Sequence, residues 1–246
     1  MKLFIIAMLL GCSFAYADDL STSTTATSVS TTAESSTSEK GSSKWGSVAG
    51  NLALTSDYIY RGQSLTNHNP AAQGEIDWTH PTGIYLGAWG SNVKIQDATT
   101  PFEADWYGGY NYSFTSSLSA GIGAMYYSYY RGSDLNTLEY PLQLTWNETK
   151  LGLAYSPHWG AADAGHAWYV SAGWSHKVKW ETTLNLNVGY SMFAPDLGIT
   201  NYEDFHAGLT RDMLGLTWDV SGYFVNAEQF NGLDDPRAVL TLSKSL

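Results

Sequence analysis

Carboxylates at alternate positions are the residues of this sequence most suited to chemistry. Glu75 and Asp77, like Glu103 and Asp105, are two residues apart, a spacing that places both members of a pair on one face of a β-strand. A sheet face bearing such rows attracts cations, and two close carboxylates share a proton or hold a cation. The side chains expected on this polar face are Asp57, Arg61, Gln73, Glu75, Asp77, Tyr85, Trp89, Glu103, Asp105, Tyr107 and Glu139.

Catalytic motifs are weak by comparison. The segment Gly173-Trp174-Ser175-His176 lacks the second glycine of a nucleophile elbow. His206 shares a predicted strand face with Asp204, but no inward serine is apparent beside them. No zinc, phosphate-loop or dinucleotide motif is present. We therefore expect no enzyme activity, no catalytic residue, no metal and no cofactor, and keep a lipid hydrolase as a minor alternative.

Hydrophobic side chains alternate with polar ones from Val48 to the end of the chain. Between Trp180 and Ser191, for example, Leu184, Leu186 and Val188 alternate with polar residues or glycine. This period of two indicates strands and excludes amphipathic helix. Twelve strands are predicted, most near the 9 to 11 residues that cross a bilayer, at 48–61, 71–80, 83–93, 102–112, 118–130, 137–146, 149–156, 166–176, 180–191, 202–210, 214–225 and 237–246.

Short turns between these strands alternate with longer loops, and aromatic residues gather near the strand ends, as at Trp78, Trp146 and Tyr155. Outer-membrane barrels typically have an even number of strands, short turns that alternate with long loops, and rings of aromatic residues near both membrane surfaces. Residues 45–246 are therefore predicted to form an all-β, transmembrane, antiparallel up-and-down barrel of about 12 strands. A soluble β-sandwich, with the apolar rows packed against each other, is the alternative fold.

Composition supports this class. The 246 residues hold 12 Lys and Arg against 23 Asp and Glu, a net charge of −11, which disfavours binding to nucleic acid. No mature segment approaches the roughly 18 consecutive apolar residues of a membrane helix. A helical membrane protein is thus not expected.

The N-terminal segment has the features of an export signal. Lys2 precedes an apolar run, and Ala15-Tyr16-Ala17 fits a signal-peptidase site, so residues 1–17 are predicted to be a signal peptide. Acylation at Cys12, the single cysteine, is the competing interpretation. Of the 18 residues from Ser21 to Ser38, 14 are Ser or Thr, and such a tract buries too little apolar surface to fold. Residues 18–44 are therefore predicted to be a disordered tether of unassigned role.

Several motifs resemble those of the TorF family of porins in proteobacterial outer membranes. They are Ser56-Asp57-Tyr58-Ile59-Tyr60-Arg61-Gly62, Pro70-Ala71-Ala72-Gln73-Gly74 with Asp77, Gly83 to Trp89 with Ser91-Asn92-Val93, and Glu103 to Tyr110. The similarity is dense over about the first sixty barrel residues and looser afterwards. Such barrels usually end in Phe, whereas this chain ends in Leu246. The resemblance implies a pore-type barrel.

We therefore expect a porin-like channel of the bacterial outer membrane for passive diffusion of ions or small polar solutes. The eleven side chains of the polar face are predicted to line its pore, and their acidic character predicts a preference for cations. Asp57 is expected to approach Glu75 or Asp77 across a hairpin. Expected partners are outer-membrane lipid, small polar solutes or cations, and the barrel-assembly machinery through Ala238 to Leu246. A non-conducting structural or adhesive barrel is the main alternative.

Overall fold

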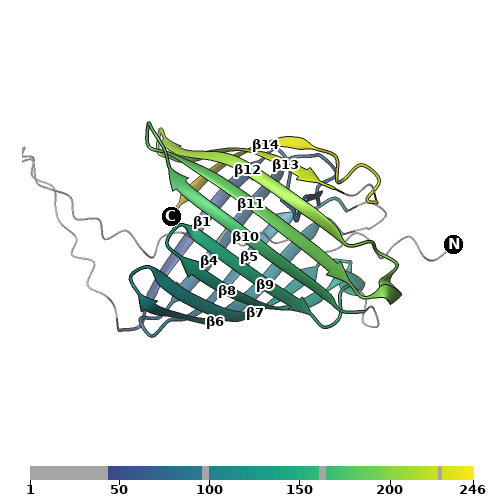
Figure 1. The fold of residues 1–246 in the computed structure, drawn as a ribbon, viewed down its shortest axis with the longest axis horizontal. Helices are drawn as coiled ribbons and strands as arrows, with labels where there is room; N and C mark the ends of the chain where they lie inside the picture. The colour runs from purple at the N-terminus through teal and green to yellow at the C-terminus, as the bar shows by residue number, and fades with distance from the viewer. Residues whose placement is uncertain (1–43, 96–99, 161–164, 227–228) are drawn as a thin grey trace, which may run out of the picture.

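The chain forms a closed antiparallel β-barrel in a computed structural model that describes residues 44–95, 100–160, 165–226 and 229–246 (Figure 1). Twelve strands make up the wall in these ranges, each paired with its neighbours in sequence, and β1 pairs with β14 to close it. They are β1 (Ser47–Thr55), β4 (Ala71–Thr79), β5 (Ile84–Asn92), β6 (Phe102–Thr115), β7 (Leu118–Tyr129), β8 (Thr137–Trp146), β9 (Thr149–Ser156), β10 (Ala167–Lys177), β11 (Thr182–Phe193), β12 (Tyr202–Met213), β13 (Leu216–Val225) and β14 (Arg237–Ser245). The predicted fold class is confirmed.

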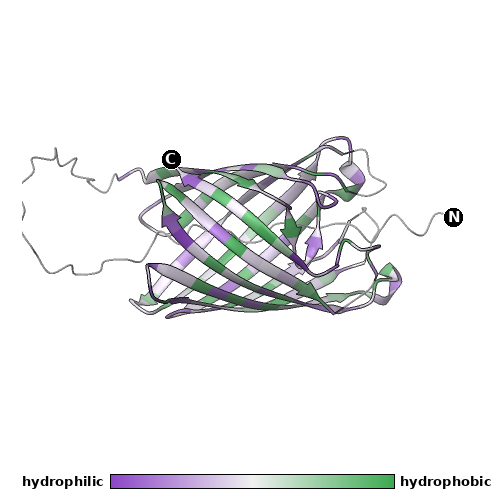
Figure 2. Cartoon of the chain, turned by 90° about the horizontal axis from the view of Figure 1, so that it is seen from above, coloured by the Kyte–Doolittle hydropathy of each residue, from purple (hydrophilic) through white to green (hydrophobic). Residues whose placement is uncertain are grey.

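The apolar rows face outward. On β11, Leu186, Val188 and Tyr190 have about two-fifths of their surface exposed, whereas the intervening Gly189 is buried. Similar alternation runs along the other strands, where hydrophobic and polar residues succeed each other around the wall (Figure 2). A sandwich would instead pack these apolar rows together. The soluble alternative is therefore wrong, and the outer wall suits acyl chains.

One predicted strand is too long. The first strand leaves the wall after Thr55, six residues before the predicted end at Arg61. Tyr58, Ile59 and Tyr60 are all buried rather than alternately exposed, because this segment packs on both sides inside the barrel. It forms a two-stranded hairpin of β2 (Ile59–Tyr60) and β3 (Gln63–Ser64). At its tip Arg61 and Gly62 have φ of 43° and 82°, the left-handed conformation that a tight hairpin turn requires.

Long loops and the inward hairpin share an apolar core at one end of the barrel. Two short 3₁₀ helices, η1 (Ser133–Leu135) and η2 (Pro195–Leu197), lie in these loops and each contributes a buried leucine. The buried residues of this core include Tyr58, Tyr60, Leu65, Val93, Met125, Tyr129, Leu135, Trp159 and Leu197, with Tyr202, Phe230 and Leu233 beside them. The long-loop end of the barrel is therefore packed with side chains.

The opposite end carries the short turns and the C-terminus (Figure 1). The Leu246 amide donates a hydrogen bond to the Gly50 carbonyl, which fixes the last residue to β1. In the part of the chain described, no helix has the length and apolarity to cross a membrane. The predicted signal peptide 1–17 and, apart from Lys44, the predicted tether 18–44 lie outside the described residues.

Candidate functional site

The inward segment 56–70 is fixed at its base by Asp57. The Asp57 carboxylate accepts hydrogen bonds from the hydroxyl groups of Ser64 and Thr66, at 2.6 and 2.7 Å. Arg237, on β14, donates to the other oxygen at 3.0 Å, and its side chain is only 10% exposed. His68 also contacts the Arg237 guanidinium. These contacts explain why the chain turns into the lumen at this point, because they satisfy a buried carboxylate there.

Arg61 lies at the tip of the hairpin, deep in the barrel. Its Nη2 donates to Glu139 Oε2 at 2.8 Å, and its guanidinium carbon lies 4.0 Å from the centre of the Tyr169 ring and 4.5 Å from that of Tyr60. Glu139 also accepts hydrogen bonds from Tyr127 and Ser156. Burial raises the pKa of the Tyr60 phenol well above its usual value, since an apolar environment disfavours the charged form. The hairpin tip is thus joined to the wall by a buried ion pair and ring contacts.

Inward carboxylates surround this hairpin. In the register of the wall, Glu75 pairs with Trp89 and Trp89 pairs with Asp105, so the three side chains form one row on the inner face. Glu103 accepts a hydrogen bond from Tyr129 at 2.7 Å, and Asp77 accepts one from Tyr107 at 2.7 Å. Trp89 contacts Tyr58 of the inward segment, with 5.2 Å between ring centres. The acidic rows therefore contact the inserted segment as well as the barrel interior.

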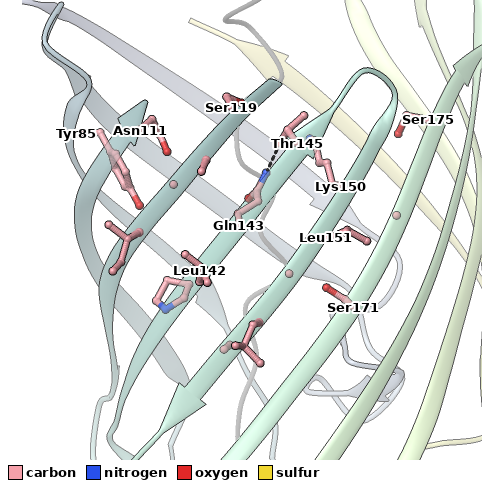
Figure 3. Close-up of a pocket in the computed structure, with 18 of the residues that line it drawn as sticks. Tyr85, Asn111, Ser119, Leu142, Gln143, Thr145, Lys150, Leu151, Ser171 and Ser175 are labelled. Carbon is pink, nitrogen blue, oxygen red and sulfur yellow. Dashed lines mark hydrogen bonds between the residues drawn. The ribbon is translucent and has the colours of Figure 1, made fainter. Parts of the chain in front are cut away.

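Beneath the hairpin, a cavity of about 1200 Å³ extends to the short-turn end. Its upper limit is formed by Tyr60, Arg61 and Gly62. The wall around it is mainly uncharged and combines polar with apolar groups, and Figure 3 shows several of these side chains, with a hydrogen bond from Gln143 to Thr145. Prominent lining residues are Tyr85, Asn111, Gln143, Lys150, Tyr169, Ser171, Asn185, Asn187, Asp204, His206 and Tyr223. Such a lining suits water and small polar solutes.

The eleven residues predicted for the polar face divide into two groups. Nine lie on the inner face of wall strands, namely Gln73, Glu75, Asp77, Tyr85, Trp89, Glu103, Asp105, Tyr107 and Glu139. The other two, Asp57 and Arg61, belong to the inward segment and not to a wall strand. Of the eleven, only Arg61 and Tyr85 border the cavity as the structure describes it.

The predicted approach of Asp57 to Glu75 or Asp77 is wrong. Glu75 pairs with Asn51 and Asp77 with Ala49 in the register of β1 and β4, whereas Asp57 turns inward and binds Arg237. The neutral lining residues, such as Asn187 and Gln143, were not among the predicted site residues. Their strand alternation places them inward, but a search led by charged groups gives amides and hydroxyls little weight.

His206 does have a serine partner, which the sequence left unidentified. Its Nε2 lies 2.9 Å from Ser221 Oγ, and this hydroxyl donates to Asp219 Oδ1 at 2.5 Å. A serine that gives its single proton to a carboxylate cannot give it to histidine, and Ser221 is only 2% exposed. The arrangement is therefore a hydrogen-bonded wall cluster without an activated nucleophile. Within the described ranges, no three His, Cys, Asp or Glu side chains could together hold a metal ion.

Comparison with family models assigns residues 39–243 to a family described as "Bacterial protein of unknown function (Gcw_chp)". The chain belongs to this family. The SDYIYRG motif, Ser56 to Gly62, lies within the matched region and forms the inward hairpin with its base. A search of curated protein sequences found no match.

Among solved structures, the chain is similar to the KdgM porin, at 12% identity and a TM-score of 0.56, over 80% of this chain and 99% of that one. A second structure, described as "KdgM porin in complex with disordered oligogalacturonate", gives 12% identity and a TM-score of 0.54 over 81% and 98%. At these identities the likeness establishes a shared barrel fold.

The fold and its outer surface determine where the chain resides. A closed barrel has no free sheet edge, because each wall strand pairs with a neighbour on both sides, and its apolar exterior is stable only against lipid. Ile76, Leu86 and Trp106 are each more than half exposed on that exterior. This porin-like barrel is a protein of the bacterial outer membrane.

Proposed function

We propose that this barrel is a channel for passive diffusion of ions or small polar solutes across the outer membrane. The observation that carries the proposal is the cavity of about 1200 Å³, lined by amides, hydroxyls and tyrosines, inside a wall whose exterior is apolar. The porin fold of its structural neighbours supports the same function. One neighbour is named in complex with oligogalacturonate, a polar solute, which agrees with polar cargo here. The closer resemblance to the TorF family remains a prediction.

The inward hairpin sets the constriction of this channel. The cavity ends at Arg61 and Gly62, and the apolar core of the long loops lies beyond them. Passage therefore requires the segment 56–70 to shift from its position against the wall. This shift must break the ion pair of Arg61 with Glu139 at the tip and the hydrogen bond that Gln63 donates to Tyr202. It must also break the ion pair of Asp57 with Arg237 at the base.

Cation preference is the finer part of the proposal. Inward-facing carboxylates outnumber inward-facing cations, which lowers the potential along the lumen and favours positive ions. The carboxylates are Asp57, Glu75, Asp77, Glu103, Asp105, Glu139, Asp204 and Asp219, and the inward cations are Arg61, Lys150 and Arg237. Reversal potential in a potassium chloride gradient tests this directly. We expect a sign that reports potassium selectivity, and chloride selectivity would contradict it.

The packed long-loop end favours one second candidate, a non-conducting structural or adhesive barrel. Swelling of vesicles that hold the refolded protein separates the two. A channel admits small sugars or amino acids and the vesicles swell, whereas a plugged barrel leaves them unchanged.

We also propose that Ala238 to Leu246, the closing strand, is the segment recognised by the barrel-assembly machinery.

A further inference from the structure

The surroundings of Arg61 have the features of a site built for a guanidinium group. The planar cation stacks over Tyr169 at 4.0 Å and donates to Glu139 at 2.8 Å. Planar stacking on an aromatic face favours guanidinium over a simple ammonium ion. Donation to a carboxylate adds a charge-assisted hydrogen bond. The Glu139 side chain is 1% exposed, so water screens this pair little.

The wall alone supplies this site. Glu139 belongs to β8, Tyr169 to β10 and Asp204 to β12, and none depends on the hairpin for its position. Tyr169 donates a hydrogen bond to Asp204 Oδ1 at 3.2 Å, which links the stacking ring to a second carboxylate. Tyr127 donates to Glu139 Oε1, and Ser156 donates to Oε2, the oxygen that Arg61 also binds, so wall residues hold both oxygens of the carboxylate. The site therefore remains assembled when the hairpin tip leaves it.

The site offers a hydrogen-bond acceptor that Arg61 does not use. Asp204 is 5% exposed, and its Oδ2 has no hydrogen-bond partner among the described residues. Arg61 Nε is likewise buried without a partner in that part of the chain. Arg61 also has a φ of 43°, a left-handed conformation that is unfavourable for a residue with a Cβ. A free solute would carry no such backbone strain.

A solute can reach this position from the short-turn end. The cavity that opens there is bordered at its inner limit by Tyr60, Arg61, Tyr169 and Asp204. Gly62, beside Arg61, lies against the Asp204 side chain, where an added Cβ would come within 3.1 Å of Asp204 Cβ. Movement of the tip would therefore uncover Glu139, Tyr169 and Asp204 together.

We infer that the position of Arg61 is a binding site for solutes that carry a guanidinium group, and that Arg61 occupies it as an internal competitor. This inference rests on the proposed channel function and names its cargo class. A guanidinium solute that enters the cavity replaces Arg61 on Glu139 and Tyr169. The displaced hairpin then leaves the constriction, so binding of the cargo and opening of the channel are the same event.

Titration calorimetry on the refolded full chain in detergent tests the inference, with guanidinium chloride at millimolar concentration as the probe. Arg61→Ala removes the competitor, so we expect affinity at least about tenfold tighter than in the wild type, as when a binding-competent state occupies less than a tenth of the population. Arg61→Ala combined with Glu139→Gln should lose this binding. Lys244→Ala is the matched control, because it removes an exposed cation of β14 that does not border the cavity, and its affinity for guanidinium should equal that of the wild type.

Choline chloride tests the class of solute, because choline carries the same charge but no planar donors. Equal affinity for choline and guanidinium, or unchanged guanidinium affinity in Arg61→Ala, would overturn the inference. If Arg61→Ala folds poorly, millimolar guanidinium should raise its thermal unfolding temperature while choline does not, and failure of this rescue also counts against the site. Binding of guanidinium without ion current would contradict the channel function and the coupling of binding to opening, while the site itself would stand. Current without guanidinium binding would contradict the site alone.

Discussion

Asp57 and Arg237 are 180 residues apart in the chain and meet where β1 leaves the wall. Their contact could not be predicted, because strand alternation indicates which face a residue occupies only while the strand continues. The same limit applies to Arg61, whose place at a hairpin tip depends on Glu139 and Tyr169 from distant strands. Wall residues such as Glu103 and Asp105 were predictable as inward, because alternation does hold there.

Arg237→Met should release the base of the inward segment. It leaves the Asp57 carboxylate buried without its cation, at a cost of about 3 kcal/mol. Hydrogen exchange at the Leu65 amide, which donates to the Tyr58 carbonyl, should accelerate accordingly. Lys244→Met is the control, because Lys244 lies on the same strand, is exposed and donates only to the Gly215 carbonyl among its described contacts. Equal protection of the Leu65 amide in the two variants would show that the ion pair of Asp57 with Arg237 does not stabilise the inward segment.

Tyr60 should make the inward hairpin sensitive to alkali. Its pKa is raised in the folded state, so its contribution to stability is complete below the unfolded pKa of about 10 and is lost as pH rises toward the folded pKa. Tyr60→Phe should leave stability near neutral pH almost unchanged, because the buried hydroxyl has no hydrogen-bond partner among the described residues. Urea unfolding between pH 8 and pH 11 gives the free energy of unfolding of both proteins. This free energy should fall less steeply with pH for Tyr60→Phe than for the wild type, by up to about 1.4 kcal/mol per pH unit. Parallel curves would contradict this role.

At the scale of elements, period-two alternation was sufficient to place the wall. Predicted and observed bounds agree within a few residues for most strands; β8 and β9, for example, match at both ends. The first strand was the exception, because Tyr58-Ile59-Tyr60 continues an apolar sequence that is equally suited to a buried hairpin. Local pattern cannot distinguish the two, since the difference lies in packing against the far wall of the barrel.

Adjacent residues of β10 test the orientation of the wall. Val170 is 42% exposed on the exterior, whereas Ser171 lines the cavity. Val170→Lys should destabilise the barrel by about 2 to 4 kcal/mol, because a charge then faces the acyl chains, and Ser171→Lys should cost much less. The folded fraction in lipid vesicles, measured by urea titration, compares the two. The opposite ranking would mean that the wall is inside out.

At the scale of the whole molecule, the barrel encloses a polar cavity at one end and an apolar core at the other. The sequence predicted a closed wall. Twelve amphipathic strands in lipid must form a barrel, because an open sheet edge would leave backbone groups without hydrogen bonds. The sequence left open whether the lumen is filled, because loop packing depends on contacts such as Trp159 with Phe193 and Phe230 with Tyr202, which no local pattern specifies. The inward hairpin unites these two halves, since its tip borders the cavity and its base joins the core.

Single-channel recording in a planar lipid bilayer tests the central claim, that this barrel conducts through its lumen. We expect the refolded wild-type chain to produce discrete current steps, with longer openings in Arg61→Ala because the tip no longer binds Glu139. An electrically silent bilayer for both proteins, with the barrel shown to be folded and inserted, would contradict the claim.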